Sequence, residues 1–132
     1  WNPQQLNEMA LPPCHVMSQF FVQDDKLSCA LYQRSGDVGL GIPFNIASYS
    51  FLTHLLAKHC DLNAGEFIHF IGNAHIYEDH KEPLLEQIKR KPKNEPTLEI
   101  MQKRENIDDY VFKDFKITNY KHHKTIKMEM RA

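Results

Sequence analysis

Two residues of this sequence, Cys14 and Arg34, have side chains suited to a nucleophilic reaction on an anionic substrate. A thiolate attacks whereas a thiol does not, so a nearby cation that lowers the thiol pKa increases the reactive fraction at neutral pH. The guanidinium of Arg34 is always charged, and its donors match the oxygens of a phosphate. Beside Cys14 it could activate the thiol and hold an anion. The alternative is a Cys14 that packs as a small buried hydrophobe, with Arg34 solvated.

One β-hairpin would bring these two residues together. The ranges Val16–Val22 and Leu27–Tyr32 are rich in Phe, Val and Leu, and a polar break that contains Asp24-Asp25 separates them. With a two-residue turn there, the numbers of opposed residues sum to 49. We therefore expect three opposed pairs at the open end: Cys14 with Ser35, His15 with Arg34, and Val16 with Gln33. Strand alternation nominally puts Arg34 on the face opposite Cys14, but a long Arg side chain at a strand end, or a bulge, could still bring its charge next to the thiol.

Length and composition indicate one domain or part of one. Of the 132 residues, 42% are hydrophobic and 25% are charged, which is typical of a packed core. A formal charge of −1 argues against a nucleic-acid-binding module, and no apolar run is long enough to span a membrane. Three cysteines without paired spacing, and no visible signal peptide, favour reduced thiols and a cytoplasmic location. Because the sequence starts at Trp1 without a Met, we expect a fragment of a longer product.

Several predicted elements would position the chemistry. Pro12-Pro13 should fix an extended entry to Cys14. A helix is expected from Ile42 to about His59, with apolar residues around most of its circumference, so it should be buried on nearly all sides. The later elements expected are a strand at Glu66–Ile71, a helix capped by Asp79 and running to about Lys91 with Leu84, Leu85 and Ile88 on its inner face, strands at Thr97–Gln102 and Phe112–Tyr120, and an edge strand or frayed end at Lys121–Ala132.

Other polar residues allow two interpretations each. Asn45, in the first turn of the predicted helix, could make a local cap or serve a site. His75 and Tyr77 are two residues apart and should point the same way on an extended chain. They could hold a sugar hydroxyl or be satisfied within a half-buried sheet. The histidine pairs His75/His80 and His122/His123 match no metal-binding pattern, so no metal site is predicted.

Five separated motifs in register resemble the thymidylate synthase family, and together they cover essentially the whole chain. They are Leu11–His15, Gln33–Asp37, Gly41–Tyr49, Gly72–Tyr77 and Ile126–Met130. The resemblance implies an α/β (α+β layered) fold in which a mixed, mainly antiparallel sheet packs against long helices, and whose sheet back forms a homodimer. Residues 1–132 would be the C-terminal part of the domain. Gly72–His75 and Asn119–His123 look closest to protozoan enzymes that are fused behind dihydrofolate reductase.

The resemblance also implies a reaction and the residues that carry it. Members of the family convert deoxyuridylate (dUMP) to thymidylate (dTMP) with the cosubstrate 5,10-methylenetetrahydrofolate and no metal. Cys14 would be the nucleophile that adds to carbon 6 of uracil. The implied catalytic residues are Cys14, Arg34, Asp37 and Asn45. The implied dUMP-binding residues are His15, Gln33, Arg34, Ser35, Gly36, Asp37, Asn45, His75 and Tyr77. The implied folate-binding residues are Asp37, Leu40, Gly41, Phe44, Arg131 and Ala132.

Asn45 indicates which base is bound. Its amide can accept from uracil N3–H while it donates to O4, whereas an Asp would favour cytosine, as in the related deoxycytidylate hydroxymethylases. The sequence departs from the family's common pattern at Gly36, Asn73 and Arg131. We expect these departures to tune the activity rather than abolish it. Two alternatives stay open: a hydroxymethylase of the same fold, and a non-catalytic piece. These 132 residues do not contain the Glu and the arginines that the family's N-terminal half carries, so on their own they are predicted not to turn over the substrate.

Overall fold

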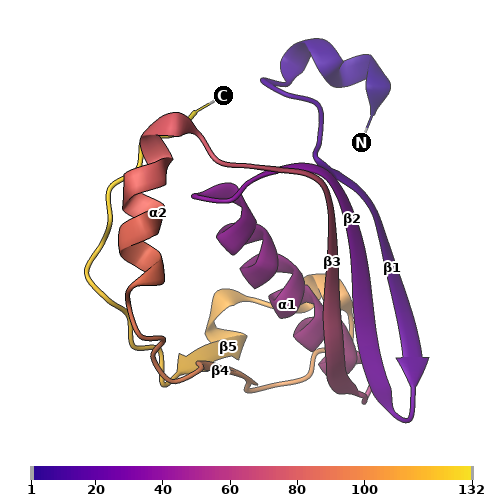
Figure 1. The fold of residues 1–132 in the computed structure, drawn as a ribbon. Helices are drawn as coiled ribbons and strands as arrows, with labels where there is room; N and C mark the ends of the chain where they lie inside the picture. Colours follow the sequence, from indigo (N-terminus) through magenta and orange to yellow (C-terminus); the bar gives the residue numbers. More distant parts are fainter. Residues whose placement is uncertain (1, 132) are drawn as a thin grey trace.

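A mixed three-stranded sheet with one long helix on its face forms the centre of the molecule (Figure 1). The structure is a computed structural model that describes residues 2–131. Strand β1 (His15–Gln23) pairs antiparallel with β2 (Lys26–Asp37), and β2 pairs parallel with β3 (Asn63–His75). Helix α1 (Gly41–His59) makes the crossover between β2 and β3 and contacts both strands. The predicted α/β class with a mixed sheet is therefore confirmed.

Shorter elements surround this centre. A second, two-stranded antiparallel sheet is formed by β4 and β5, and α2 lies on the other side of α1 from the three-stranded sheet (Figure 1). The bounds are η1 Pro3–Glu8, η2 Glu78–His80, α2 Lys81–Ile88, β4 Thr97–Ile100, η3 Ile107–Asp109, η4 Phe112–Asp114 and β5 Phe115–Thr118, where η marks a 3-10 helix. Among the described residues, no helix combines the length and the apolar character that a membrane crossing needs.

The hairpin forms as predicted at its turn and differs at its open end. Asp24 and Asp25 have φ angles of 49° and 61°, as a two-residue type I′ turn requires. Opposed numbers sum to 49 from the turn as far as Met17, but a bulge between His15 and Met17 then shifts the register. His15 consequently faces Gln33, so the three expected pairs at the open end are wrong by one residue.

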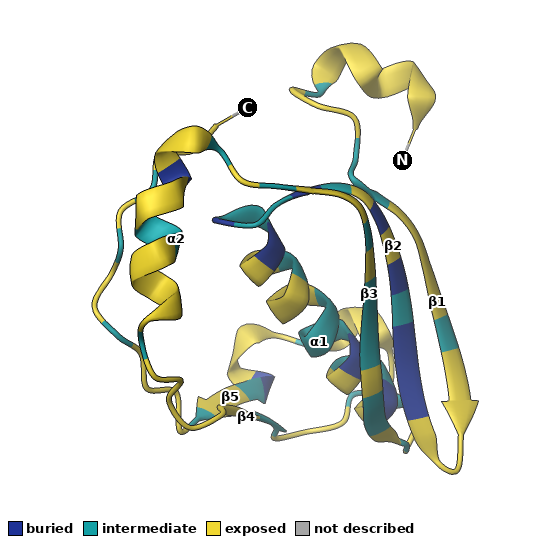
Figure 2. Cartoon of the chain, viewed as in Figure 1, coloured by how far each residue is buried: buried dark blue, intermediate teal, exposed yellow. Residues whose placement is uncertain are grey.

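The core lies between the inner face of β2 and one side of α1. Leu27, Cys29 and Leu31, on the face of β2 that packs on α1, are buried, and Ser28 between them is buried as well. Figure 2 shows β2 as the most deeply buried strand of the sheet. Ile42 and Ala57 cover this face of β2 from α1. The candidate site residues lie at the C-terminal end of β2 and at the start of α1.

The predicted burial of α1 on nearly all sides is wrong for this chain. Phe44 is 73% exposed and Ile46 is also exposed, although both are apolar. The face that packs on the three-stranded sheet is the most deeply buried, and Phe51 packs on Phe115 of β5 with ring centroids 4.8 Å apart. The apolar content of the helix therefore indicated how much surface could be buried, and the neighbouring elements decide how much is buried here.

The second half of the chain also differs in detail from the predictions. Helix α2 ends at Ile88, which is 75% exposed, and Leu85 is exposed too, so neither belongs to an inner face. Asp79 lies in the preceding 3-10 turn and makes no cap bond to α2. Strands β4 and β5 are shorter than predicted, and β3 is longer. Residues 119–131 contain no strand, so the tail is not an edge strand; it runs beside α2 (Figure 1).

Candidate active site

A cavity of about 400 Å³ opens where the ends of β2 and β3 meet the start of α1. It contains Cys14 together with every residue predicted to bind the nucleotide. The full lining is Leu11, Cys14, His15, Gln33, Arg34, Ser35, Gly36, Asp37, Gly41, Asn45, His75, Tyr77 and Arg131. Leu40 and Phe44 do not line it, and Ala132 lies outside the described residues. Leu11 was not predicted, because nothing marks an apolar residue before Pro12-Pro13 as part of a site.

Arg34 holds the segment that carries the nucleophile candidate. Its Nε donates to the carbonyl of Pro13 at 3.1 Å, and its Nη2 donates to the carbonyl of Pro12 at 2.5 Å. Its backbone N–H donates to the carbonyl of Cys14 at 2.9 Å, so the bulged strand end still pairs with β2. A guanidinium has five N–H donors, and these contacts use two of them. Arg34 therefore fixes the Cys14 loop and keeps further donors for an anion.

An amide network forms the wall behind the cavity. Gln33 is 2% exposed, and its Nε2 donates to the Ser35 carbonyl at 2.8 Å and to Asn45 Oδ1 at 2.9 Å. Its Oε1 lies 2.8 Å from Nε2 of His69. Burial lowers the pKa of His69, and the nearby His15 lowers it further, so the neutral ring is favoured. Every polar atom of the Gln33 amide thus has a partner.

Sequence reasoning missed His69. It was counted only as part of the strand Glu66–Ile71. His69 pairs with Leu31 across the parallel β2–β3 ladder, which places it on the inner face near Gln33. Alternation could have placed His69 on the face of Phe67 and Ile71, but its contact with Gln33 depends on the β2–β3 register, for which no local signal exists.

Asp37 organises the opposite wall through the loop that follows β2. Its Oδ1 accepts from the Gly39 N–H at 2.9 Å, and its Oδ2 accepts from the Leu40 N–H at 3.1 Å. His80 lies behind it and is fully buried. Its Nδ1 is 3.6 Å from Asp37 Oδ1, too far for a hydrogen bond, and has no partner among the described residues. A Cβ on Gly39 would lie 2.8 Å from that nitrogen, so the close packing requires glycine.

The C-terminal tail completes this wall. Nε2 of His80 is 2.7 Å from the carbonyl of Glu129, which can only accept, so Nε2 is the donor. Arg131 donates from Nε and Nη2 to Oδ2 of Asp79 at 3.0 and 2.6 Å. These hydrogen bonds lower the pKa of the Asp79 carboxyl. A buried imidazole and a surface ion pair therefore tether the tail next to the cavity.

His75 and Tyr77 lie at the end of β3, on the remaining side. Their rings meet edge to face with centroids 5.3 Å apart, and both line the cavity, as their spacing predicted. Among residues 2–131, no group of three or more His, Cys, Asp or Glu side chains is arranged to hold a metal ion. The arrangement offers a thiol, an arginine, amide donors and acceptors, and hydroxyl-binding groups to one small polar ligand.

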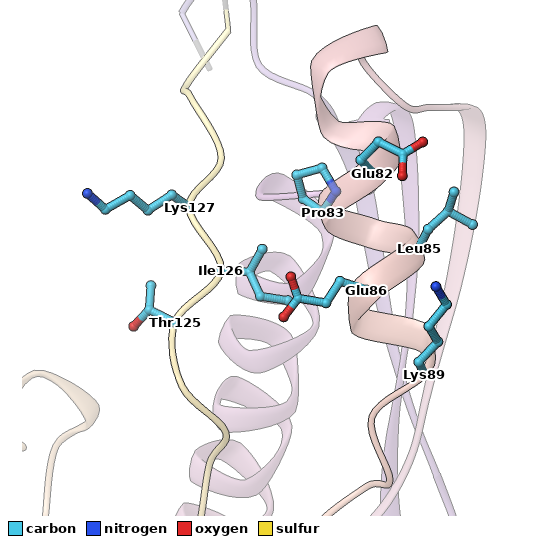
Figure 3. Close-up of a pocket in the computed structure, with 8 residues that line it drawn as sticks. All are labelled: Glu82, Pro83, Leu85, Glu86, Lys89, Thr125, Ile126 and Lys127. Atoms are coloured by element: carbon cyan, nitrogen blue, oxygen red, sulfur yellow. The ribbon is translucent and has the colours of Figure 1, made fainter.

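A second cavity, of about 530 Å³, lies between α2 and the tail (Figure 3). Figure 3 shows Glu86 and Ile126 extending from the two segments toward the space between them. Its lining consists of Glu82, Pro83, Leu85, Glu86, Lys89, Thr125, Ile126 and Lys127. None of these residues is a predicted site residue, and none is a nucleophile placed against a base. The chemistry of the molecule is concentrated in the first cavity.

The fold and the first cavity define a layered α/β protein with a thiol and an arginine beside a polar ligand pocket. The family model described as thymidylate synthase matches residues 1–132, and the chain belongs to the thymidylate synthase family. It is 56% identical over 130 residues to the thymidylate synthase of Homo sapiens, covering 98% of this chain and 42% of the human protein.

Bifunctional relatives also match. The chain is 56% identical over 130 residues to the bifunctional dihydrofolate reductase-thymidylate synthase of Paramecium tetraurelia, covering 98% of this chain and 28% of that protein. It is 52% identical over 130 residues to the bifunctional protein of Zea mays, covering 98% of this chain and 25% of that protein. The chain therefore spans less than half the length of these curated relatives.

Proposed function

We propose that this chain is the nucleophile-bearing, C-terminal part of a thymidylate synthase that methylates dUMP to dTMP with 5,10-methylenetetrahydrofolate. The observation that carries the proposal is the gathering of Cys14, Arg34 and Asn45 around one cavity of about 400 Å³ in a chain of this family. A nucleophile, an anion-binding group and a base-reading amide are the groups that this reaction needs.

The nucleophile acts by covalent catalysis. The Sγ of Cys14, as thiolate, forms a bond to carbon 6 of uracil, and the electron pair of the C5–C6 double bond moves toward carbon 5 and O4. Carbon 5 thereby becomes the nucleophile that attacks the one-carbon unit of the folate. Asn45 stabilises the charge that develops on O4 by donating from Nδ2, an interaction that strengthens in the transition state.

The other lining residues bind the rest of the two substrates. Arg34 and Ser35 bind the phosphate, because both retain donors at the cavity wall. His75 and Tyr77 bind the deoxyribose hydroxyl. On the folate side, Asp37 and Gly41 line the cavity, and so does Arg131, which is paired with Asp79 and tethers the tail there. Leu40 is connected to this group through its N–H bond to Asp37.

The test compares two cysteine variants of the intact gene product that carries this sequence. Cys14→Ser should lower the rate of dTMP formation by at least about 10³-fold, because serine is a far weaker nucleophile. Cys60→Ser is the matched control, because Cys60 is exposed at the far end of α1, and it should stay within about twofold of wild type. Equal rates for Cys14→Ser and Cys60→Ser would refute the proposal.

Product analysis separates the alternatives in the same assay. Hydroxymethyl-deoxyuridylate in place of dTMP would identify a hydroxymethylase. The isolated 132 residues should bind nucleotide weakly and form no product, because the family's N-terminal half supplies further catalytic groups. Turnover by this piece at the rate of the intact protein would contradict that expectation.

Assembly and context are part of the proposal. The sheet face opposite α1 exposes Met17, Phe21, Tyr32 and Phe70, an apolar surface that suits a homodimer interface. The bifunctional relatives support a fused dihydrofolate reductase domain. We place the protein in the cytoplasm, on the basis of its free cysteines. Light scattering of the intact protein checks the dimer, and a monomeric mass would contradict it.

A further inference from the structure

We propose that His69, which does not line the cavity, is a positioning residue that holds Asn45 in the orientation that reads uracil. This inference rests on the proposed function. It assigns base specificity to a hydrogen-bonded network of three side chains, His69, Gln33 and Asn45. The three are joined by hydrogen bonds of 2.8 and 2.9 Å. Only Asn45 would touch the base.

The Ser35 carbonyl sets the direction of the hydrogen bonds that join these three side chains. A backbone carbonyl only accepts, so the atom of Gln33 that lies 2.8 Å from it must be the donor Nε2. The other atom of the amide, Oε1, then faces His69 and must accept. Nε2 of His69 therefore carries the proton, which assigns the tautomer of the ring.

The same logic fixes Asn45. The second N–H of Gln33 points at Asn45 Oδ1, and a flipped Asn45 would place two N–H donors against each other. An amide oxygen has two lone pairs, so Oδ1 keeps one for uracil N3–H, while Nδ2 is left to donate to O4. Cytosine presents the opposite pattern, a bare N3 and an amino group. It could be met only if the amide flipped against Gln33.

His69 stabilises this orientation of the Gln33 and Asn45 amides, because water cannot easily replace its ring N–H as the donor to Gln33 Oε1. Gln33 is 2% exposed, so without His69 its Oε1 would be a buried acceptor with no partner. Such an amide can relax by rotating, and rotation of Gln33 would release Asn45. The lowered pKa of His69 keeps the ring neutral near pH 7, with its single proton available for Nε2.

The experiment measures the affinities of the intact gene product for dUMP and dCMP by calorimetry. His69→Phe keeps a planar ring and removes the donor, and the ratio of dUMP to dCMP affinity should fall about tenfold. His69→Gln can place an amide N–H near the position of Nε2, and its ratio should stay within about threefold of wild type. His54→Phe, the same substitution at an exposed histidine of α1 that does not line the cavity, is the matched control and should leave the ratio unchanged.

Each outcome decides one question. A folded His69→Phe variant whose ratio stays within twofold of wild type overturns the inference. A wild-type protein that does not prefer dUMP overturns the proposed function instead. If His69→Phe does not fold, ¹⁵N NMR of the wild-type imidazole at pH 7 decides: a proton on Nε2 supports the inference, and a proton on Nδ1 overturns it.

Discussion

The two walls of the cavity are built in different ways. The sheet wall consists of Gln33 with its partners Ser35, Asn45 and His69, and the tail wall consists of Asp37, His80 and the tail residues Glu129 and Arg131. On the sheet wall, Gln33 has no unpaired polar atom, and its partners Ser35, Asn45 and His69 belong to strands or a helix. On the tail wall, His80 has one nitrogen bound to a carbonyl and one without a partner among the residues that the structure describes. The buried amide of the sheet wall is therefore fully hydrogen-bonded, whereas the buried imidazole of the tail wall is not.

The difference follows from how each wall is held. The register of a strand ladder fixes the sheet wall, and many backbone hydrogen bonds must break together to move it. The described part of the tail has no strand ladder, and its contacts at this wall join residues 49 and 52 positions apart in sequence. Such contacts can open one at a time. We infer that the sheet wall is pre-organised to read the base, whereas the tail wall can adjust to the folate.

A substitution of Asn45 should have the largest effect on the function of the sheet wall. In Asn45→Asp an ionised carboxylate accepts but cannot donate to O4, so kcat/KM for dUMP should fall by about 10²-fold or more. The preference between dUMP and dCMP should shift toward dCMP. Asn94→Asp is the matched control, because it is the same chemical change on an exposed loop residue outside the cavity. Steady-state kinetics measure both, and an unchanged kcat/KM for dUMP in Asn45→Asp would contradict the assignment.

A substitution of His80 should affect the tail wall and leave nucleotide binding nearly unchanged. His80→Leu removes the donor to the Glu129 carbonyl, so the tail should dock less tightly and KM for the folate should rise about tenfold. KM for dUMP should change less than twofold. His54→Leu, an exposed histidine on α1, is the control. Equal increases in both KM values would mean that His80 supports the whole fold rather than the tail.

Local patterns predicted the elements of the sheet wall well. Apolar runs and Asp24-Asp25 predicted the hairpin, and the bounds of α1 agree with Gly41–His59 to within a residue. A bulge was one of the two expected ways to bring Arg34 next to Cys14, but its position before Met17 was not predicted, because it depends on how the Cys14 segment packs and not on any local residue type. The exposure of α1 was missed for a similar reason: apolar content shows what a helix can bury, and tertiary contacts decide what it does bury.

Motifs, and not geometry, suggested which residues could share a site. The resemblance named most of the residues that line the cavity, but it also named Leu40 and Phe44, which do not line it, and it did not name Leu11. Periodicity alone suggested the shared side of His75 and Tyr77 and little else. His69 and His80 carry no motif, and their positions depend on the β2–β3 register and on where the tail docks. Contacts between distant segments of this kind cannot be inferred from one sequence.

Acid should weaken the sheet wall before it weakens the tail. The folded pKa of His69 lies below its ordinary value of 6.5, so the unfolded chain binds a proton more readily. Stability linked to neutral His69 is therefore present above that value and is lost as the pH falls below it. The melting temperature should decrease more from pH 7.5 to 5.5 in wild type than in His69→Gln. Identical pH profiles for these two proteins would show that His69 does not contribute.

The ion pair of the tail should respond differently, and it should give the smallest effect. The pKa of Asp79 is lowered from 3.8, so its contribution is present above that value and is lost only as the pH falls through the lower, folded one. The side chains of Arg131 and Asp79 are 50% and 41% exposed, and such pairs are weak and screened by salt.

Arg131→Ala should therefore raise KM for the folate by no more than about threefold at low salt, and by less at 0.5 M NaCl. Asp79→Asn should give the same result, and the double variant should add nothing to either. If Arg131→Ala cost tenfold or more while Asp79→Asn did not, Arg131 would be binding the ligand directly. The tail wall would then contain a charged group that binds its ligand directly, as Asn45 on the sheet wall is proposed to bind the base.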